Sequence, residues 1–272
     1  MRKIFILLFV PVTLVSNAQF YYTPMPPGKA DFLLNEKSGI KICYEYRIED
    51  DTRILVSILE YDSKGLPAVK YEKGTNDDGD SVTVGETTYA YDKNLQIETL
   101  TTTDMEEGSS QTTRFTRNQK GRVIKKEMTD IDPPTYTYTY DAAGKLATCS
   151  LTIRMPTYDE EGEPTGKSFD KPEARMVYKY DSKGRLAEEW YYPADESTAG
   201  TVPQQKITWT YNTKNQLSVI QWKDADGAVS RTVRLAYNDR GLLISQVIEF
   251  ADGEKQEYVY EYCTDCKQSW MK

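Results

Sequence analysis

Hydrophobic and polar residues alternate with a period of two along most of the chain after residue 40. Met176, Tyr178 and Tyr180 fall on one face of such a segment, and Lys179 falls on the other. Alternation of this kind predicts antiparallel strands with one covered face and one wet face. Helical periodicity is confined to the first residues of the chain, so the sequence predicts an all-β fold.

A motif recurs where these strands would turn. It consists of an aromatic residue, any residue, Tyr, Asp or Asn, two further residues, Gly or Asn, Arg or Lys, and Leu. Clear copies begin at residues 138, 178, 209 and 235, and looser copies begin at 59, 89 (with one residue missing) and 115. The structural residues of the motif are Tyr61, Tyr91, Tyr140, Asp141, Gly144, Tyr180, Asp181, Gly184, Tyr211, Asn212, Tyr237, Asn238 and Gly241.

Each copy of the motif predicts a β-hairpin. The Asp or Asn side chain can accept hydrogen bonds from backbone N–H groups two residues on, and the Gly supplies the left-handed residue that closes a type I turn with a G1 bulge. This register pairs the Tyr before the turn with the Leu two residues after the Gly. The predicted pairs are Tyr140 with Leu146, Tyr180 with Leu186, Tyr211 with Leu217, and Tyr237 with Leu243.

A second set of turns, rich in Asp, Glu and Gly, lies between the copies. Two longer connections, residues 155–173 and 194–204, are rich in Pro, Gly, Asp and Glu. The segments between all these turns number about sixteen, from Lys41 to Tyr262. Because closure is what removes both exposed edges of a meander, we expect a closed or nearly closed barrel-like sheet. An open twisted sheet and a flattened sandwich are the alternatives.

The Tyr-Asp-x-x-Gly-Arg/Lys-Leu units resemble YD repeats, the hairpin repeat of rearrangement-hotspot (RHS) proteins and of insecticidal toxin-complex shells. The resemblance covers roughly residues 40 to 262. In large family members it implies a sheet that spirals into a hollow cocoon around a toxin segment. This chain lacks the self-cleaving core domain and the toxin domain, so the shell function is not implied. The chain is also similar to small secreted bacterial proteins of unknown function whose hairpins form a porin-like barrel.

The first eighteen residues have the features of a secretory signal peptide. Arg2 and Lys3 precede an apolar run from residue 4 to residue 15, and Ser16 and Ala18 are small residues at the −3 and −1 positions. We therefore predict cleavage after Ala18 and a secreted or periplasmic protein without a lipid anchor. The predicted organisation is a signal peptide (1–18), an extended Pro-rich leader (19–39), a repeat domain (40–266) and a C-terminal tail (267–272).

The chain has 21 Tyr, no His and a formal net charge of −8. The lack of His removes Ser-His-Asp and Cys-His nucleophile pairs and imidazole metal sites. An acidic chain without a Lys/Arg stripe is not expected to bind nucleic acid, and its charge is expected to repel an anionic membrane surface.

Pairs of carboxylates are the remaining candidates for catalysis or calcium binding. They are expected to be solvated turn residues, and the candidate calcium loops lack the distal Glu of an EF-hand. We therefore predict no enzyme activity, no catalytic residues, no metal and no cofactor. The carboxylate groups are Asp50-Asp51, Asp77-Asp78, Asp159-Glu160-Glu161 and Asp224-Asp226.

The four cysteines, Cys43, Cys149, Cys263 and Cys266, are disulfide candidates because the chain is predicted to be exported. Cys263 and Cys266 occupy the Asp and Gly positions of a final repeat turn, so a bond between them would clamp that turn. Alternatively, Cys43 on the first strand pairs with one of these two, which requires the first and last strands to be neighbours.

Rows of aromatic residues on one sheet face suggest binding of a glycan or another protein. The predicted function is therefore an exported, non-enzymatic binding role at the bacterial envelope. A structural envelope component, an outer-membrane β-barrel and a carboxylate-dependent hydrolase are the alternatives, although the short strands make membrane insertion the less favoured one. The contact residues proposed from surface aromatics in less regular segments are Trp190, Tyr191, Tyr192, Trp222 and Trp270.

Overall fold

The computed structural model describes residues 39–76, 78–129, 134–159, 161–194 and 202–264. These residues form sixteen antiparallel strands, and none of them is helical. The strands are β1 (Ile42–Glu49), β2 (Thr52–Tyr61), β3 (Pro67–Thr75), β4 (Ser81–Tyr91), β5 (Ile97–Asp104), β6 (Ser110–Arg117), β7 (Val123–Met128), β8 (Thr135–Tyr140), β9 (Leu146–Tyr158), β10 (Pro164–Tyr180), β11 (Leu186–Pro193), β12 (Gln205–Tyr211), β13 (Leu217–Asp224), β14 (Val229–Tyr237), β15 (Leu243–Phe250) and β16 (Lys255–Cys263).

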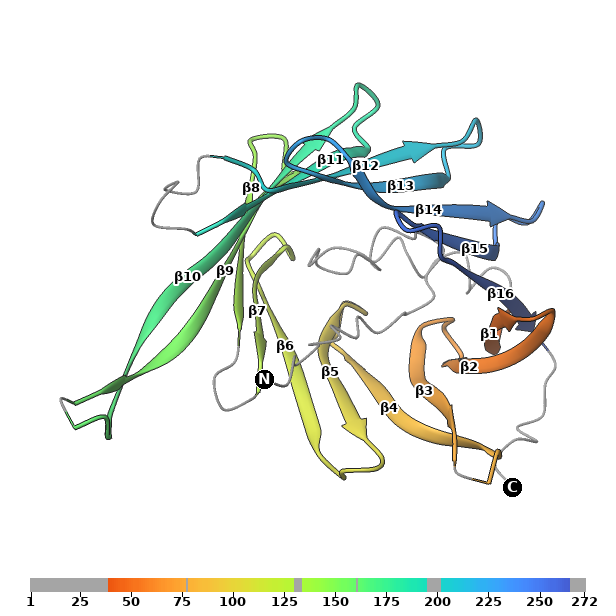
Figure 1. The fold of residues 1–272 in the computed structure, drawn as a ribbon, viewed down its shortest axis with the longest axis horizontal. Coiled ribbons are helices and arrows are strands. Elements are labelled where there is room, and N and C mark those ends of the chain that lie inside the picture. The colour runs from red at the N-terminus through yellow and green to blue at the C-terminus, as the bar shows by residue number, and fades with distance from the viewer. Residues whose placement is uncertain (1–38, 77, 130–133, 160, 195–201, 265–272) are drawn as a thin grey trace.

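The strands follow one another around a closed barrel, and β1 pairs with β16 to complete the ring (Figure 1). In this closing pair Cys43 lies opposite Tyr262, and Glu45 lies opposite Tyr260. The prediction of a closed meander of sixteen strands is therefore confirmed, and the sheet is neither open nor a sandwich.

Seven turns of five residues each connect the hairpins of the repeated motif, and we call them the motif turns. In every one the fourth residue has a positive φ, between 60° and 83°. The first residue of the turn accepts backbone hydrogen bonds through its side chain, as Asp62 does from the N–H groups of Lys64 and Leu66. The four predicted Tyr–Leu pairs are all present, each beside a register shift. The motif turns are residues 62–66, 92–96, 118–122, 141–145, 181–185, 212–216 and 238–242.

The copy of the motif near residue 89 is complete, contrary to the expectation that one residue is missing. Leu95 occupies the Gly position with φ of 60°, and its N–H donates to the Asp92 carbonyl. Tyr91 pairs with Ile97, which takes the Leu position. The motif is hard to recognise in this copy because the turn has Leu95, a non-Gly residue, in the left-handed region. Such residues are uncommon there.

Four of the motif tyrosines, and Tyr262 on the last strand, each join their hairpin to the one before it. Their hydroxyl groups donate to the backbone carbonyl of the residue at the Leu position of the preceding hairpin. This repeated bond gives the motif Tyr a structural role that its ring alone would not supply. The bonds run from Tyr91 to Pro67, Tyr140 to Val123, Tyr180 to Leu146, Tyr211 to Leu186 and Tyr262 to Leu243, over 2.6–3.0 Å.

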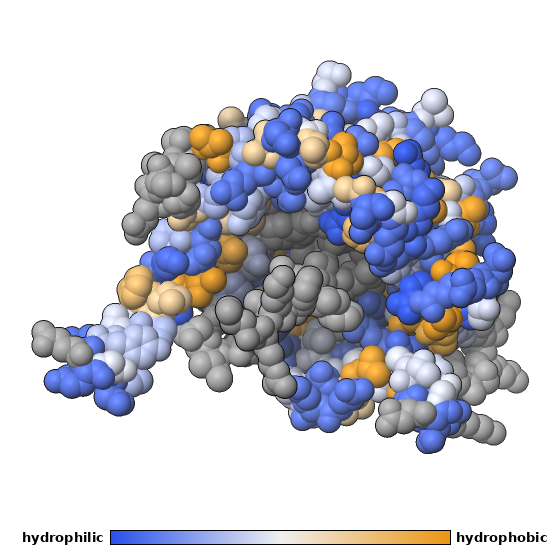
Figure 2. Space-filling view, in the orientation of Figure 1, coloured by the Kyte–Doolittle hydropathy of each residue, from blue (hydrophilic) through white to orange (hydrophobic). Residues whose placement is uncertain are grey.

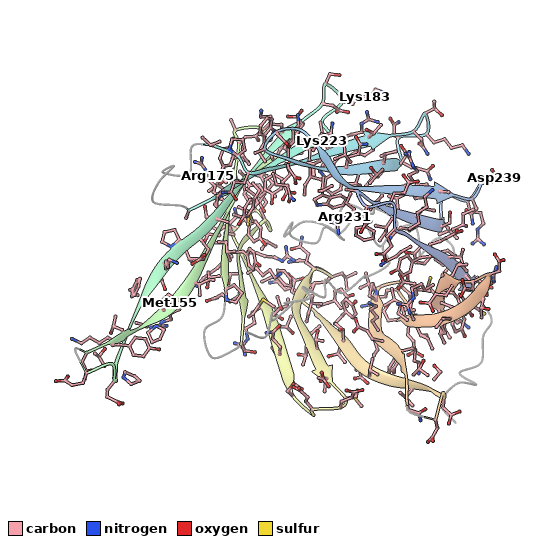
Figure 3. The ribbon with its side chains drawn as sticks, in the orientation of Figure 1. Met155, Arg175, Lys183, Lys223, Arg231 and Asp239 are labelled. Carbon is pink, nitrogen blue, oxygen red and sulfur yellow. The ribbon has the colours of Figure 1, made fainter. Side chains whose placement is uncertain are left out.

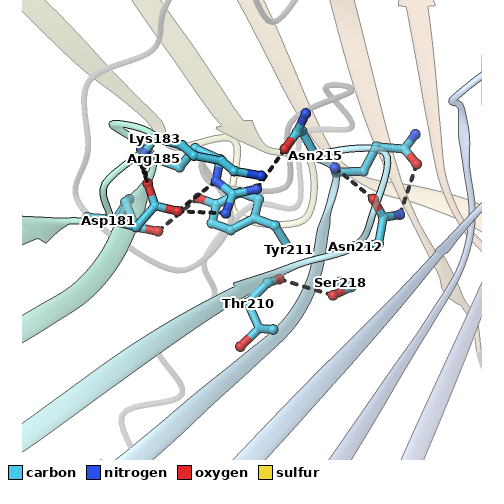
Figure 4. Close-up of polar contacts among 10 residues, drawn as sticks. Asp181, Lys183, Arg185, Thr210, Tyr211, Asn212, Asn215 and Ser218 are labelled. Atoms are coloured by element: carbon cyan, nitrogen blue, oxygen red, sulfur yellow. Dashed lines mark hydrogen bonds and ion pairs between the residues drawn. The ribbon is translucent and has the colours of Figure 1, made fainter.

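The basic residue of the motif forms a second link between hairpins (Figure 4). Arg185 lies over the ring of Tyr211, with its guanidinium carbon 4.3 Å from the ring centroid, and donates to Asn215 in the next motif turn. Arg122 lies over Tyr140 in the same way, 5.3 Å from the centroid.

A meander places alternate connections at opposite ends of the barrel. The motif turns therefore form one rim, the motif rim, and the other connections form the return rim. Residues 155–173, predicted to be a long connection, instead belong mostly to β9 and β10, which extend beyond the ring as a hairpin (Figure 1). The outer part of this hairpin is exposed and pairs only with itself.

The two faces of the sheet differ in polarity. Buried residues such as Tyr138, Tyr178 and Trp209 share one face with Trp222 and Arg231, and Arg231 lies inside the ring in Figure 3. Hydrophilic residues predominate among the described residues on the side that Figure 2 shows, with scattered hydrophobic residues between them. The predicted covered face is thus the inner face of the barrel, and the wet face is its outer wall.

Candidate functional site

A bulge after each motif turn determines which residues face inward. In β11, Tyr180 pairs with Leu186 but Lys179 pairs with Glu188, so Ala187 is left without a paired residue. Glu189, the third residue after Leu186, therefore faces inward. The equivalent residues of the seven hairpins form what we call the inner layer: Lys70, Leu100, Lys126, Cys149, Glu189, Ile220 and Gln246.

One polar cluster of the inner face joins the strands that close the barrel. The two carboxyl oxygens of Glu45 accept hydrogen bonds from Ser57 at 2.6 Å and from Tyr260 at 3.2 Å. Burial raises the pKa of Glu45, and the nearby Lys70 ammonium opposes this rise. Lys70 itself pairs with Glu72. Because both Glu45 oxygens have partners, this cluster is accounted for by its structural role in holding β16, β1 and β2 together.

A second polar cluster, on β10–β12, is different because its buried polar atoms have no hydrogen-bond partners among the described residues. These atoms are the hydroxyl of Tyr178, Oε2 of Glu189 and Nε1 of Trp209. Each residue is at most 5% exposed. Tyr178 lies directly opposite Glu189, and Trp209 is two residues along β12 from Ile207, which is also opposite Glu189. We call these three residues the Glu189 cluster.

The side chains of the Glu189 cluster are mostly uncharged at neutral pH. Burial raises the pKa of Glu189 to about 8, so the carboxyl is mostly protonated and can both donate and accept hydrogen bonds. Burial also raises the pKa of Cys149 to about 12, with Glu189 contributing, and lowers the pKa of Lys126. An unpaired buried polar group costs about 1–3 kcal/mol. The cluster therefore holds neutral donors and acceptors whose hydrogen-bonding capacity is unused among the described residues.

The five aromatic residues proposed as a contact surface do not come together. Trp190 lies on the outer wall, where Lys179 and Lys206 stack on its ring, and Tyr192 lies there beside Arg175. The expectation that Trp222 is a surface residue is wrong, because it is 4% exposed on the inner face against Arg231. Tyr191 also packs against the core from the inner face. Trp270 lies outside the described residues.

The cysteines do not form the predicted bond between the first and last strands. Cys43 and Cys149 are free and buried, although β1 and β16 are neighbours. The reason is the register: Cys43 faces inward opposite Tyr262, whereas Cys263 is paired with Ile42 on the other face. Cys263 is disulfide-bonded. Cys266 lies outside the described residues, so the clamp on the last turn stays a prediction.

The described carboxylates of the predicted catalytic or calcium groups lie at the return rim, in turns or at strand ends, as expected. Within the described segments, no group of three or more His, Cys, Asp or Glu side chains is arranged to hold a metal ion. No helix in those segments is long and apolar enough to be a transmembrane span. Asp77 and Glu160 lie outside the described residues, as do the predicted signal peptide and nearly all of the predicted leader.

Sequence reasoning missed Glu189. Simple alternation from Leu186 places Glu188 inside and Glu189 outside, whereas the bulge at Ala187 reverses the two. The signal was available, because the motif itself predicts a bulge at the turn. The sequence did not show that Oε2 of Glu189 lacks a hydrogen-bond partner among the described residues, because this depends on the neighbouring strands.

No protein-family model and no curated protein matches the chain. Among solved structures, a porin-like protein from Bacteroides uniformis is similar, with a TM-score of 0.51 and 13% identity over 82% of this chain and 98% of that chain. A porin-like protein from Bacteroides vulgatus matches with a TM-score of 0.46 and 13% identity over 82% of this chain and 99% of that one. The TcdB2-TccC3-Cdc42 structure matches with a TM-score of 0.30 and 13% identity over 83% of this chain and 16% of that one. The first of these similarities shows a shared barrel fold.

Proposed function

We propose that this protein is an exported, non-enzymatic barrel of the YD-repeat type that binds a neutral, hydroxyl-rich ligand such as a glycan on its inner face. The observation that carries this proposal is the Glu189 cluster, in which three buried polar atoms on adjacent strands lack partners among the described residues. Sugar hydroxyls donate and accept hydrogen bonds, and sugar rings stack on aromatic side chains. A neutral carboxyl, a phenol and an indole match both needs without a charge to desolvate.

The outer wall supports a barrel surrounded by water. Its strands carry threonine pairs such as Thr139 with Thr148 and ion pairs such as Arg234 with Glu249. A barrel in a membrane needs an apolar band on this face. We therefore propose a secreted or periplasmic location in preference to membrane insertion.

Binding without hydrolysis at the Glu189 cluster is proposed because no second carboxyl lies beside Glu189 on the inner face among the described residues, and burial alone raises its pKa. Glu45 on β1 and Glu189 on β11 are separated by six strand steps around the ring, roughly 29 Å along the sheet. A glycosidase pair lies about 5–9.5 Å apart.

The test is a glycan array followed by calorimetry on the mature protein. Tyr178→Phe is expected to weaken binding of a neutral glycan by about tenfold, because it removes one ligand hydrogen bond. Tyr180→Phe is the matched control, since that hydroxyl already bonds to Leu146. Binding by the unmodified protein is expected to fall above about pH 8 as Glu189 ionises, whereas Glu189→Gln binds independently of pH over this range. Equal losses in Tyr178→Phe and Tyr180→Phe, or no neutral glycan bound at all, would refute the proposal.

A further inference from the structure

The two rims of the barrel differ sharply in charge. The seven motif turns contain nine Lys or Arg residues and five Asp residues. By sequence, the eight return connections contain eighteen Asp or Glu residues and no Lys or Arg, and twelve of these acids lie among the described residues. The motif-rim cations are Lys64, Lys93, Lys120, Arg122, Lys145, Lys183, Arg185, Lys214 and Arg240.

These motif-rim cations have two different roles. Arg122, Lys145 and Arg185 stack on the tyrosine of the next hairpin, so they help to hold the rim together. Others project from the turn tips, as Lys183 does in Figure 3. Lys64, Lys120 and Lys183 occupy the same turn position, directly before the left-handed Gly, and all three are exposed.

The net charge of the whole chain does not describe the field at the motif rim. A strand of eight residues, such as β5 or β6, spans roughly 27 Å before tilt. Charges in physiological salt are screened beyond about 8 Å. The acidic return rim is therefore too distant to cancel the basic motif rim, and an anionic surface approaching the barrel end-on meets the cations first.

We propose that the motif rim docks on an anionic membrane surface, with the barrel standing end-on and its acidic rim directed away. This inference is independent of the ligand at the Glu189 cluster. Adjacent motif turns are two strands apart, or roughly 10 Å, so the lysine tips form a wide ring. A wide ring fits an extended surface with many phosphate headgroups better than one small anion. The acidic rim would be repelled by the same surface, which fixes the orientation.

The test measures sedimentation of the mature protein with vesicles of phosphatidylglycerol and phosphatidylcholine, and with vesicles of phosphatidylcholine alone. Binding is expected only to the anionic vesicles and is expected to weaken with salt. The triple variant Lys64→Gln/Lys120→Gln/Lys183→Gln is expected to bind about 100-fold more weakly, because each lysine near such a surface contributes about fivefold.

The matched control is Lys167→Gln/Lys171→Gln/Lys255→Gln. It makes the same change in net charge with exposed residues of the β9–β10 hairpin and of the return-rim end of β16. This control is expected to bind nearly as the unmodified protein does. Equal loss in both variants would show an effect of net charge alone and would overturn the proposal.

Three further outcomes also overturn it. The first is competition by inorganic phosphate that is much stronger than that by chloride at equal ionic strength, which would indicate a site for a small anion. The second is tighter binding of duplex DNA than of the vesicles. The third is salt-sensitive self-association, seen by sedimentation velocity without vesicles and abolished in the triple motif-rim variant, which would assign the rim to contact with the acidic rim of a second copy.

Discussion

Arg117 donates a hydrogen bond from its guanidinium to the backbone carbonyl of Ile97 over 2.8 Å. Arg117 occupies the position that tyrosine takes in the other motif copies, and Ile97 occupies the Leu position of the preceding hairpin. The bond between hairpins is therefore kept although the residue type has changed. What the fold requires at this position is a long side chain with a donor at its end.

Replacement of Arg117 tests that requirement. Arg117→Leu is expected to lower the free energy of unfolding by about 1–3 kcal/mol, because it removes the hydrogen-bond donor to the Ile97 carbonyl. Arg117→Tyr restores the motif and is expected to keep most of the stability. Arg114→Leu, at an exposed position on the same strand, is the control and should change stability by no more than about 0.5 kcal/mol. Chemical denaturation measures all three, and equal effects of the two leucine variants would contradict the interpretation.

Two tyrosines on β10 should respond differently to loss of the hydroxyl. Tyr180→Phe removes the bond to the Leu146 carbonyl and is expected to cost about 1–2 kcal/mol. Tyr178→Phe removes a buried hydroxyl without a partner among the described residues, so it is expected to be neutral or stabilising without ligand. Thermal and chemical unfolding of the two variants provide the comparison. A larger loss for Tyr178→Phe would mean that its hydroxyl is satisfied in the native protein.

Gly144 has a positive φ of 83°, and a Cβ atom there would overlap the guanidinium of Arg122. Gly144→Ala is therefore expected to cost about 1–2 kcal/mol from the backbone, plus about 0.5–1 kcal/mol from displacing Arg122 off Tyr140. Gly227→Ala has the same backbone problem, with φ of 87°, but open space around the new atom. The extra cost should disappear when Gly144→Ala is combined with Arg122→Ala. A double-mutant cycle measures this coupling, and a value of zero would exclude the contact.

The buried carboxyl of Glu189 makes stability depend on pH. Its pKa is raised from 4.5 to about 8 in the folded protein, so the unfolded chain loses this proton more readily than the folded one. The contribution of Glu189 to stability is therefore fully present below about pH 4 and is lost as pH rises to about 8, with a limiting slope of about 1.4 kcal/mol per pH unit. Glu189→Gln is expected to flatten this decline. Denaturation midpoints from pH 5 to pH 9 measure it, and parallel curves for the two proteins would contradict the prediction.

The free thiols of Cys43 and Cys149 should be inert in the folded protein. Both are buried, and burial raises the pKa of Cys149 to about 12 and that of Cys43 well above its usual range. Because the thiolate is the reactive form, we expect slow reaction with a disulfide reagent at pH 8 and reaction of both thiols in denaturant. Peptide mapping of the labelled protein identifies the sites. Rapid labelling of Cys149 without denaturant would show that the inner face opens.

The hairpins could be predicted from the sequence because their determinants are local. An Asp or Asn and a Gly within five residues specify the turn, and the turn specifies the register that pairs Tyr140 with Leu146. The copy at Asp92 was misaligned because Leu95 is in the left-handed region without the residue type that usually marks it. The long β9–β10 hairpin was missed because Pro and Gly suggest a loop, whereas pairing of the two strands satisfies their backbone groups.

The candidate site could be predicted only in part. The alternation places Tyr178 on the same face as Met176 and Tyr180, but it does not place Glu189 there, because a single bulge residue exchanges the two faces of β11. The lack of partners in the Glu189 cluster depends on what three adjacent strands bring together. By contrast, Glu45 is satisfied by Ser57 and by Tyr260, which is more than two hundred residues away in the chain.

The repeat, the turn type, the register within each hairpin and the number of strands follow from the sequence alone, since each depends on contacts within about ten residues. Contacts between distant parts of the chain, in contrast, establish that β1 meets β16, that the tyrosine face is the inner one, and that Tyr91, Tyr140, Tyr180 and Tyr211 bond to the preceding hairpin. The barrel topology also determines how charge is distributed between the two rims. Acids and lysines alternate along the chain with the turns, and the antiparallel meander sends alternate turns to opposite ends. An acidic chain therefore forms a barrel with one basic rim.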